Sequence, residues 1–138
     1  MNNTILALIG YLGWTVLLLS WLEAYRTMLV MKKEKTPNGF QTDGSDMNAF
    51  GLRLTRTLGN CMESFAFIGG TMLLALASGA AAITNPLALY LLLARILQSV
   101  THLISTSELA VQLRFVFFLA QQFIVIYWLY LLAVNFLG

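Results

Sequence analysis

Two arginines, an amide and a carboxylate recur at helical spacing where the chain passes into a long apolar segment. These residues are Arg53, Arg56, Asn60 and Glu63. At about 100° per residue, they fall within roughly one quarter of a helix circumference. Three more polar residues extend the same stripe, namely Asp46, Ser64 and Thr71. Because polar groups on a bilayer-length helix must face other helices or a wet cavity, the stripe predicts a functional site.

A second polar stripe lies on the third apolar segment. It consists of Arg95, Ser99, His102 and Thr106, with Gln98 at its margin. Arg95 lies about 11 residues from the cytoplasmic end of this segment, or roughly 16 Å deep by helical rise. An unpaired arginine there costs about 2.5–3.5 kcal/mol, so a nearby anion is expected. Glu63 is the only acidic residue at membrane depth on the second segment, and we predict an Arg95–Glu63 contact.

The remaining candidates leave alternatives open. Arg114 lies about two turns into the fourth segment, with Gln121 on the same face. Arg26 can pair with Glu23 three residues earlier, or it can point into the bundle and contribute to a ligand site. His102 is either a helix-contact residue or a donor at the mouth of the site.

The net positive charge of these polar residues indicates the kind of ligand that they would bind. Arg53, Arg56, Arg95 and Arg114 outnumber Glu63, and all lie in the predicted cytoplasmic half of the membrane. Arginine forms bidentate contacts with carboxylates, so the pocket suits an anionic small molecule that enters from the cytoplasm. Its apolar flank would admit a lipid-soluble second molecule.

The hydrophobic composition of the chain predicts that membrane-spanning helices position these residues. The chain has 138 residues, of which 59% are hydrophobic and 10% charged, whereas soluble proteins have about 25% charged residues. Crossing the hydrocarbon takes roughly 20 apolar residues. Four segments qualify, at about 4–30, 57–82, 86–106 and 109–137. We predict an all-α integral membrane protein, a single domain formed by a bundle of four transmembrane helices.

The distribution of positive charge predicts the orientation. Six basic residues flank or occupy the first connection, namely Arg26, Lys32, Lys33, Lys35, Arg53 and Arg56. The two tails and the connection 80–86 contain no Lys or Arg. By the positive-inside rule both termini are non-cytoplasmic, and the loop at about 32–45 is cytoplasmic. Its lysines would contact anionic headgroups of membrane lipids.

Local signals predict where the helices begin. Ser45 or Asp46 is placed to cap the second helix. Pro86 is predicted to start the third. Ser105 and Glu108 have the spacing of a capping box before the fourth.

The sequence lacks the residues needed for a disulfide, a metal cluster, a nucleotide-binding loop or a Ser/His/Asp catalytic site. The single cysteine, Cys61, cannot form an intrachain disulfide or a metal cluster, and its place on the apolar side of its helix indicates packing. No nucleotide-binding loop, zinc motif or Ser/His/Asp order is present. We therefore predict no metal site and no nucleic-acid partner.

The pattern Arg56-x-x-x-Asn60-x-x-Glu63 at the start of the second of four spans resembles a known signature. It is similar to that of the membrane-associated proteins in eicosanoid and glutathione metabolism. This superfamily includes microsomal glutathione transferases, leukotriene C synthase and microsomal prostaglandin E synthase. The resemblance extends to the long first loop, the tight third connection, Arg95, and Arg114 followed by Leu119-Ala120-Gln121.

The resemblance implies a homotrimer that binds glutathione, as co-substrate, between neighbouring subunits at the cytoplasmic side. Arg56, Asn60 and Glu63 would hold the peptide and Arg95 would support them. Arg114 would be the catalytic residue that stabilises the glutathione thiolate. Four further residues complete the predicted glutathione-binding set, namely Arg53, His102, Gln98 and Arg26.

The chain departs from the pattern at several positions. Thr57-Leu58-Gly59 occupies places where many relatives carry Arg-Ala-His before the Asn or a further arginine beside it. His102 and Phe117 or Phe118 replace tyrosines found in glutathione-binding members. Phenylalanine can stack on a ligand but cannot donate a hydrogen bond.

The sequence leaves three possible functions open. The favoured one is a glutathione-dependent transferase or peroxidase acting on lipophilic electrophiles or lipid hydroperoxides. The alternatives are a non-catalytic lipid-binding member of the superfamily and, less favoured, a small four-span transporter. Glu23, the carboxylate in the first span, lies close to the cytoplasmic end, and the arginines disfavour a cation path. The absence of a retrieval signal favours a bacterial inner membrane, or the endoplasmic reticulum if the source is eukaryotic.

Overall fold

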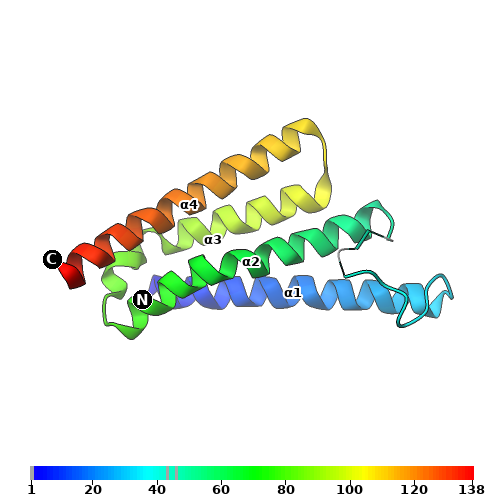
Figure 1. The fold of residues 1–138 in the computed structure, drawn as a ribbon, viewed down its shortest axis with the longest axis horizontal. Helices are drawn as coiled ribbons and strands as arrows, with labels where there is room; N and C mark the ends of the chain where they lie inside the picture. The colour runs from blue at the N-terminus through cyan, green and yellow to red at the C-terminus, as the bar shows by residue number, and fades with distance from the viewer. Residues whose placement is uncertain (1, 43, 46) are drawn as a thin grey trace.

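Four long α-helices form the fold, and the all-α prediction is confirmed. The computed structural model describes residues 2–42, 44–45 and 47–138. Its helices are α1 (Asn3–Met31), α2 (Ala49–Ala77), α3 (Ala81–Ile104) and α4 (Glu108–Leu137). All four are long and apolar enough to cross a membrane. They run up and down beside one another, with both termini at one end and the α1–α2 loop and α3–α4 connection at the other (Figure 1).

The predicted starts of α2 and α4 are wrong. Asn48, not Ser45, caps α2, and its side chain accepts a hydrogen bond from the backbone N–H of Gly51 at 2.8 Å. The alternative cap, Asp46, lies outside the described residues. Ser107 caps α4 by accepting from Ala110 N at 3.2 Å. Ser105 instead accepts a hydrogen bond from Ser107 N, so it belongs to the connection.

The α2–α3 connection is shorter than predicted. The chain reverses at Gly79, whose φ of 74° is a left-handed conformation suited to glycine. Helix α3 begins at Ala81, so Pro86 lies inside the helix rather than starting it. Thr84 and Asn85 explain the early start, because both bond to α1. The Thr4 hydroxyl lies 2.6 Å from that of Thr84, and Thr4 N donates to Asn85 Oδ1 at 3.0 Å.

The packing of the bundle differs between its two ends. Near the termini all four helices share one core, which contains Tyr11, Met72, Leu91 and Trp128. At the loop end the core comes from α1, α2 and α3 alone. Helix α4 buries no side chain between Ala110 and Gln121, and Figure 1 shows its first half diverging from α2. The bundle therefore opens between α2, α3 and α4 in the half that carries the polar residues.

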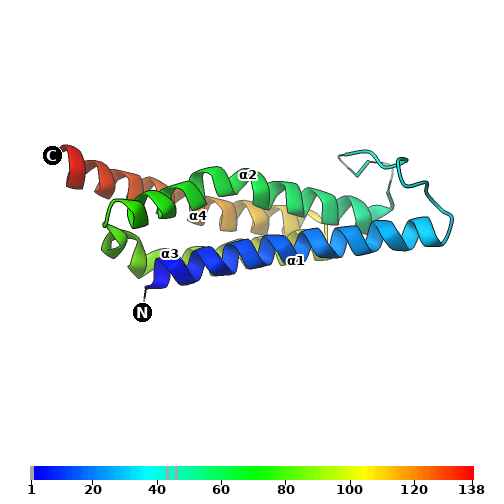
Figure 2. The ribbon, with the colours of Figure 1, turned by 90° about the horizontal axis from the view of Figure 1, so that it is seen from below.

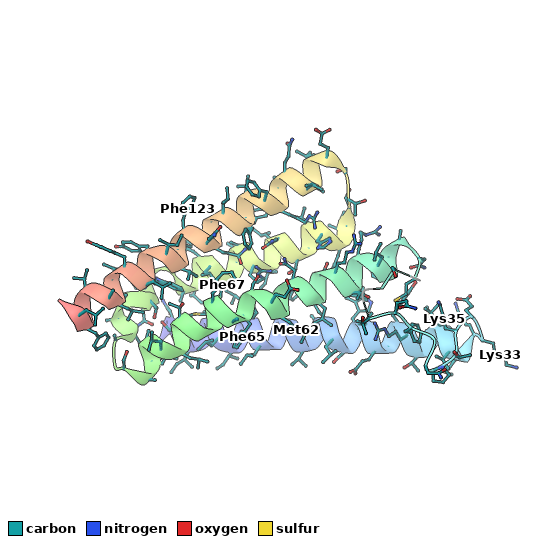
Figure 3. The ribbon with its side chains drawn as sticks, viewed as in Figure 1. Lys33, Lys35, Met62, Phe65, Phe67 and Phe123 are labelled. Carbon is teal, nitrogen blue, oxygen red and sulfur yellow. The ribbon has the colours of Figure 1, made fainter. Side chains whose placement is uncertain are left out.

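The outer surface of the helices is apolar. Phe123 of α4 is 65% exposed and points away from the other helices (Figure 3). Lys33 and Lys35 lie in the α1–α2 loop, which extends beyond the ends of α3 and α4 (Figure 2). An apolar surface with its basic residues at one end is typical of a protein that spans a bilayer.

Candidate functional site

Asn60 lies between two cavities at the open end of the bundle. The first, which we call the α2–α3 cavity, has a volume of about 410 Å³. It is lined by Thr42, Thr55, Arg56, Gly59, Asn60, Glu63 and His102. The second, the α4 cavity, has a volume of about 280 Å³ and is lined by Asn60, Gln98, Val111, Arg114, Phe115 and Phe118. One amide therefore faces both spaces.

The α2–α3 cavity brings together three residues of the predicted α2 stripe and one residue of the predicted α3 stripe. Arg56, Asn60 and Glu63 come from successive turns of α2, and His102 comes from α3. Arg56 and Glu63 are both exposed, and no ion pair joins them in the described part of the chain. One charge of each sign is therefore available to a ligand.

The α1–α2 loop contributes to the same cavity through Thr42. Gly44 holds this part of the loop close to α2. Its φ is 75°, and a Cβ at this position would lie 2.7 Å from the Thr55 hydroxyl oxygen. A glycine is needed here both for the backbone conformation and for the close approach.

The α4 cavity combines an arginine with aromatic side chains. Arg114 is half-buried, and its Nε atom is buried without a hydrogen-bond partner among the described residues. Val111, Phe115 and Phe118 supply an apolar wall on the same helix. The cavity can therefore hold an anionic group beside a lipophilic one.

Arg95 anchors a buried hydrogen-bond network between the helices. Its side chain is 1% exposed. Its Nε donates to Gln121 Oε1 at 2.9 Å and its Nη1 donates to Asn60 Oδ1. Gln121 Nε2 in turn donates to Gln98 Oε1 at 2.8 Å and to the carbonyl oxygen of Phe117 at 3.0 Å. The network links α2, α3 and α4.

The predicted Arg95–Glu63 contact is wrong. Among the residues that the structure describes, Arg95 bonds to amide oxygens and approaches the Cys61 sulfur at 3.9 Å, and it makes no ion pair with Glu63. Neutral amide oxygens accept from the guanidinium in place of a carboxylate. Cys61 is fully buried and its sulfur lies 3.2 Å from the Ser99 hydroxyl, which agrees with a packing role.

Two of the predicted site arginines do not line either of these cavities. Arg53 Nε donates to the carbonyl oxygen of Leu103 at 2.9 Å, so it satisfies one of the free carbonyls at the C-terminal end of α3. Arg26 lines a separate cavity of about 450 Å³, and its guanidinium carbon lies 5.3 Å from the centre of the Phe40 ring. The described residues show no Arg26–Glu23 ion pair.

Sequence reasoning did not anticipate two contributors. Thr42 belongs to an irregular loop whose position depends on packing around Gly44. Helical spacing puts Gln121 on the same face as Arg114. In the structure its side chain is completely buried and accepts a hydrogen bond from Arg95. The signal available from the sequence is a glutamine within a long apolar segment, because a buried amide requires hydrogen-bond partners.

These features define an integral membrane protein with four spanning helices and a basic, partly apolar site at one end of the bundle. The chain belongs to the MAPEG family, which it matches over residues 4–134. This match confirms the resemblance to the membrane-associated proteins in eicosanoid and glutathione metabolism. Comparisons with curated proteins and with solved structures gave no match.

Proposed function

We propose that the protein is a glutathione-dependent membrane transferase or peroxidase. It would join the glutathione thiolate to a lipophilic electrophile, or use it to reduce a lipid hydroperoxide. The observation that carries this proposal is the pair of cavities that share Asn60. One is polar with charges of both signs, and the other combines Arg114 with an apolar wall.

The charges of the α2–α3 cavity suit a peptide zwitterion. Glutathione has two carboxylates and one ammonium group. Arg56 would bind a carboxylate through its planar fork of donors, Glu63 would accept from the ammonium, and His102 would complete the mouth of the site. The volume, about 410 Å³, lies within the about 300–1,000 Å³ usual for small-molecule sites.

Arg114 is the proposed thiolate-stabilising residue. A free cysteine thiol has a pKa of about 8.5, and a neighbouring cation lowers the pKa of a thiol. The thiolate is the nucleophile, so Arg114 would raise its population without transferring a proton itself. Phe115 and Phe118 would contact the lipophilic co-substrate, which reaches the α4 cavity from the bilayer.

The proposed assembly is a homotrimer with glutathione between subunits. Arg26 and Arg53 do not line the two cavities of their own chain. In such a trimer they would contact glutathione bound in the site of a neighbouring protomer. The six basic residues at the loop end support an orientation with this end, and the site, facing the cytoplasm. The proposed location is a bacterial inner membrane, or the endoplasmic reticulum in a eukaryote.

The test is an ultraviolet thiolate difference spectrum on adding glutathione to the purified protein, repeated with Arg114→Ala and Arg56→Ala. We expect a thiolate signal in the parent and its loss in both variants. Turnover of chlorodinitrobenzene with glutathione would demonstrate the transferase activity. A parent protein that neither binds nor consumes glutathione would contradict the proposal and favour the lipid-binding alternative.

A further inference from the structure

The proposed function places the glutathione sulfur beside Arg114 in the α4 cavity, and we infer that Gln121 is the positioning residue that leaves only hydrogen-bond donors among the polar side chains lining this cavity. This inference rests on the proposed function, because the sulfur reaches the α4 cavity only if glutathione occupies the α2–α3 cavity beside it.

Arg95 determines the direction of the network because a guanidinium has donors and no acceptor. The amide groups of Asn60 and Gln121 must therefore turn their oxygens toward Arg95. The amide nitrogen of Gln121 then faces away from Arg95, where it donates to Gln98 Oε1 and to the Phe117 carbonyl. No alternative amide orientation preserves all four bonds.

The two ends of the network consequently present nitrogen atoms. The oxygen of Asn60 is occupied by Arg95 and that of Gln98 by Gln121, so each residue retains a free NH₂ group. Neither NH₂ group has an acceptor within the described part of the protein. Asn60 and Gln98 both line the α4 cavity, where their NH₂ groups are available to a bound anion.

The charged side chain that lines the α4 cavity is a cation. Arg114 supplies the third donor group, and no acidic residue is among the side chains that line the cavity. Within this lining, the Nε atom of Arg114 is buried and lacks an acceptor among the described residues. Buried donors without acceptors are costly, and an entering anion such as a thiolate relieves that cost.

Gln121 acts through Gln98 and Arg95 rather than by touching the sulfur. Without its NH₂ group, the Gln98 oxygen loses its donor and is free to turn toward the cavity, where a lone pair would repel a thiolate. Without its oxygen, Arg95 loses one of two amide acceptors. Removing the Gln121 amide should therefore change the ionisation of bound glutathione more than its binding, because Arg56 and Glu63 are unaffected.

The experiment measures the pH midpoint of the thiolate difference spectrum for glutathione bound to the purified full-length protein. Gln121→Met removes the amide at similar length, and Gln122→Met makes the same change at the neighbouring exposed position of α4. We expect the Gln121 variant to raise the midpoint by about one pH unit, a tenfold change in the ionisation equilibrium. The Gln122 variant should match the parent.

Each outcome decides the inference. If the parent forms thiolate and Gln121→Met keeps the parental midpoint, the donor-only subsite is wrong and the proposed function stands. If the parent forms no thiolate, both fail. If the Gln121 variant does not fold, Gln98→Met removes one donor directly and should raise the midpoint in the same direction. An unchanged midpoint in that variant would also overturn the inference.

Discussion

The Nη1 atom of Arg95 donates a hydrogen bond to the side-chain oxygen of Asn60, which lies 35 residues earlier on a different helix. This bond joins a buried guanidinium to the residue that lines both cavities. It has two consequences. It gives a buried cation a neutral partner, and it fixes which end of the amide faces a ligand.

Asn60→Asp separates these two consequences. The new carboxylate would give the buried Arg95 guanidinium an opposite charge as well as a hydrogen-bond acceptor, and such a doubly charged hydrogen bond is among the strong ones. It would also remove the free NH₂ group and place a negative charge beside the proposed thiolate. We expect a higher Tm in detergent together with weaker binding of glutathione.

Asn48→Asp is the matched control, because it makes the same exchange at the cap of the same helix, where Asn and Asp serve about equally well. Neither Tm nor glutathione affinity should change substantially in this control. A lower Tm with unaltered affinity in Asn60→Asp would contradict the assigned role of the Asn60–Arg95 bond.

Gly59 provides a steric test of the α2–α3 cavity. A Cβ at this position would meet no atom within 4 Å, and glycine inside a helix costs about 0.5–1 kcal/mol relative to alanine. Gly59→Ala should therefore raise Tm slightly and retain glutathione binding, whereas Gly59→Trp should fill the cavity and abolish binding.

Gly70 is the control for this series, since a Cβ there also meets nothing within 4 Å and Gly70 does not line the cavity. Gly70→Trp should bind glutathione as the parent does. Equal binding by Gly59→Trp and Gly70→Trp, measured by calorimetric titration, would show that the ligand binds elsewhere.

Tyr11 tests the buried contact between α1 and α2. Its side chain is fully buried, and its hydroxyl donates to the backbone carbonyl of Cys61. Tyr11→Phe removes this bond and retains the ring, which packs 5.4 Å from Phe65 between centroids. We expect a loss of about 0.5–1.5 kcal/mol of stability, observed as a lower Tm.

Tyr90→Phe is the corresponding control, because Tyr90 is 66% exposed on the outer surface of α3. This substitution should leave Tm nearly unchanged. If the two tyrosine variants have the same Tm, the Tyr11–Cys61 bond contributes nothing to the fold.

Hydropathy and helical spacing predicted the four helices and the convergence of Arg56, Asn60 and Glu63, because both depend on local periodicity. The start of α3 was not predictable in this way. Thr84 and Asn85 bond to Thr4, which lies about 80 residues away, and this tertiary contact extends the helix ahead of Pro86. Turn chemistry alone could not reveal it.

The partner of Arg95 was missed for a different reason. Charge counting favours the nearest carboxylate, but two amide oxygens accept hydrogen bonds from the guanidinium here. Such a choice depends on the relative rotation of three helices, which helical periodicity within each segment does not predict. The same limit applies to Arg53, which bonds to the end of α3 instead of lining the α2–α3 cavity.

The central claim is that the α2–α3 cavity binds glutathione through Arg56, and an equilibrium titration with glutathione tests it most directly. The parent should bind, and Arg56→Ala should weaken binding by about 10- to 100-fold, the loss expected for a charged hydrogen bond. Lys33→Ala, which removes the same charge from the exposed loop, should bind like the parent. Equal affinities for the parent and Arg56→Ala, or no binding by the parent, would contradict the claim.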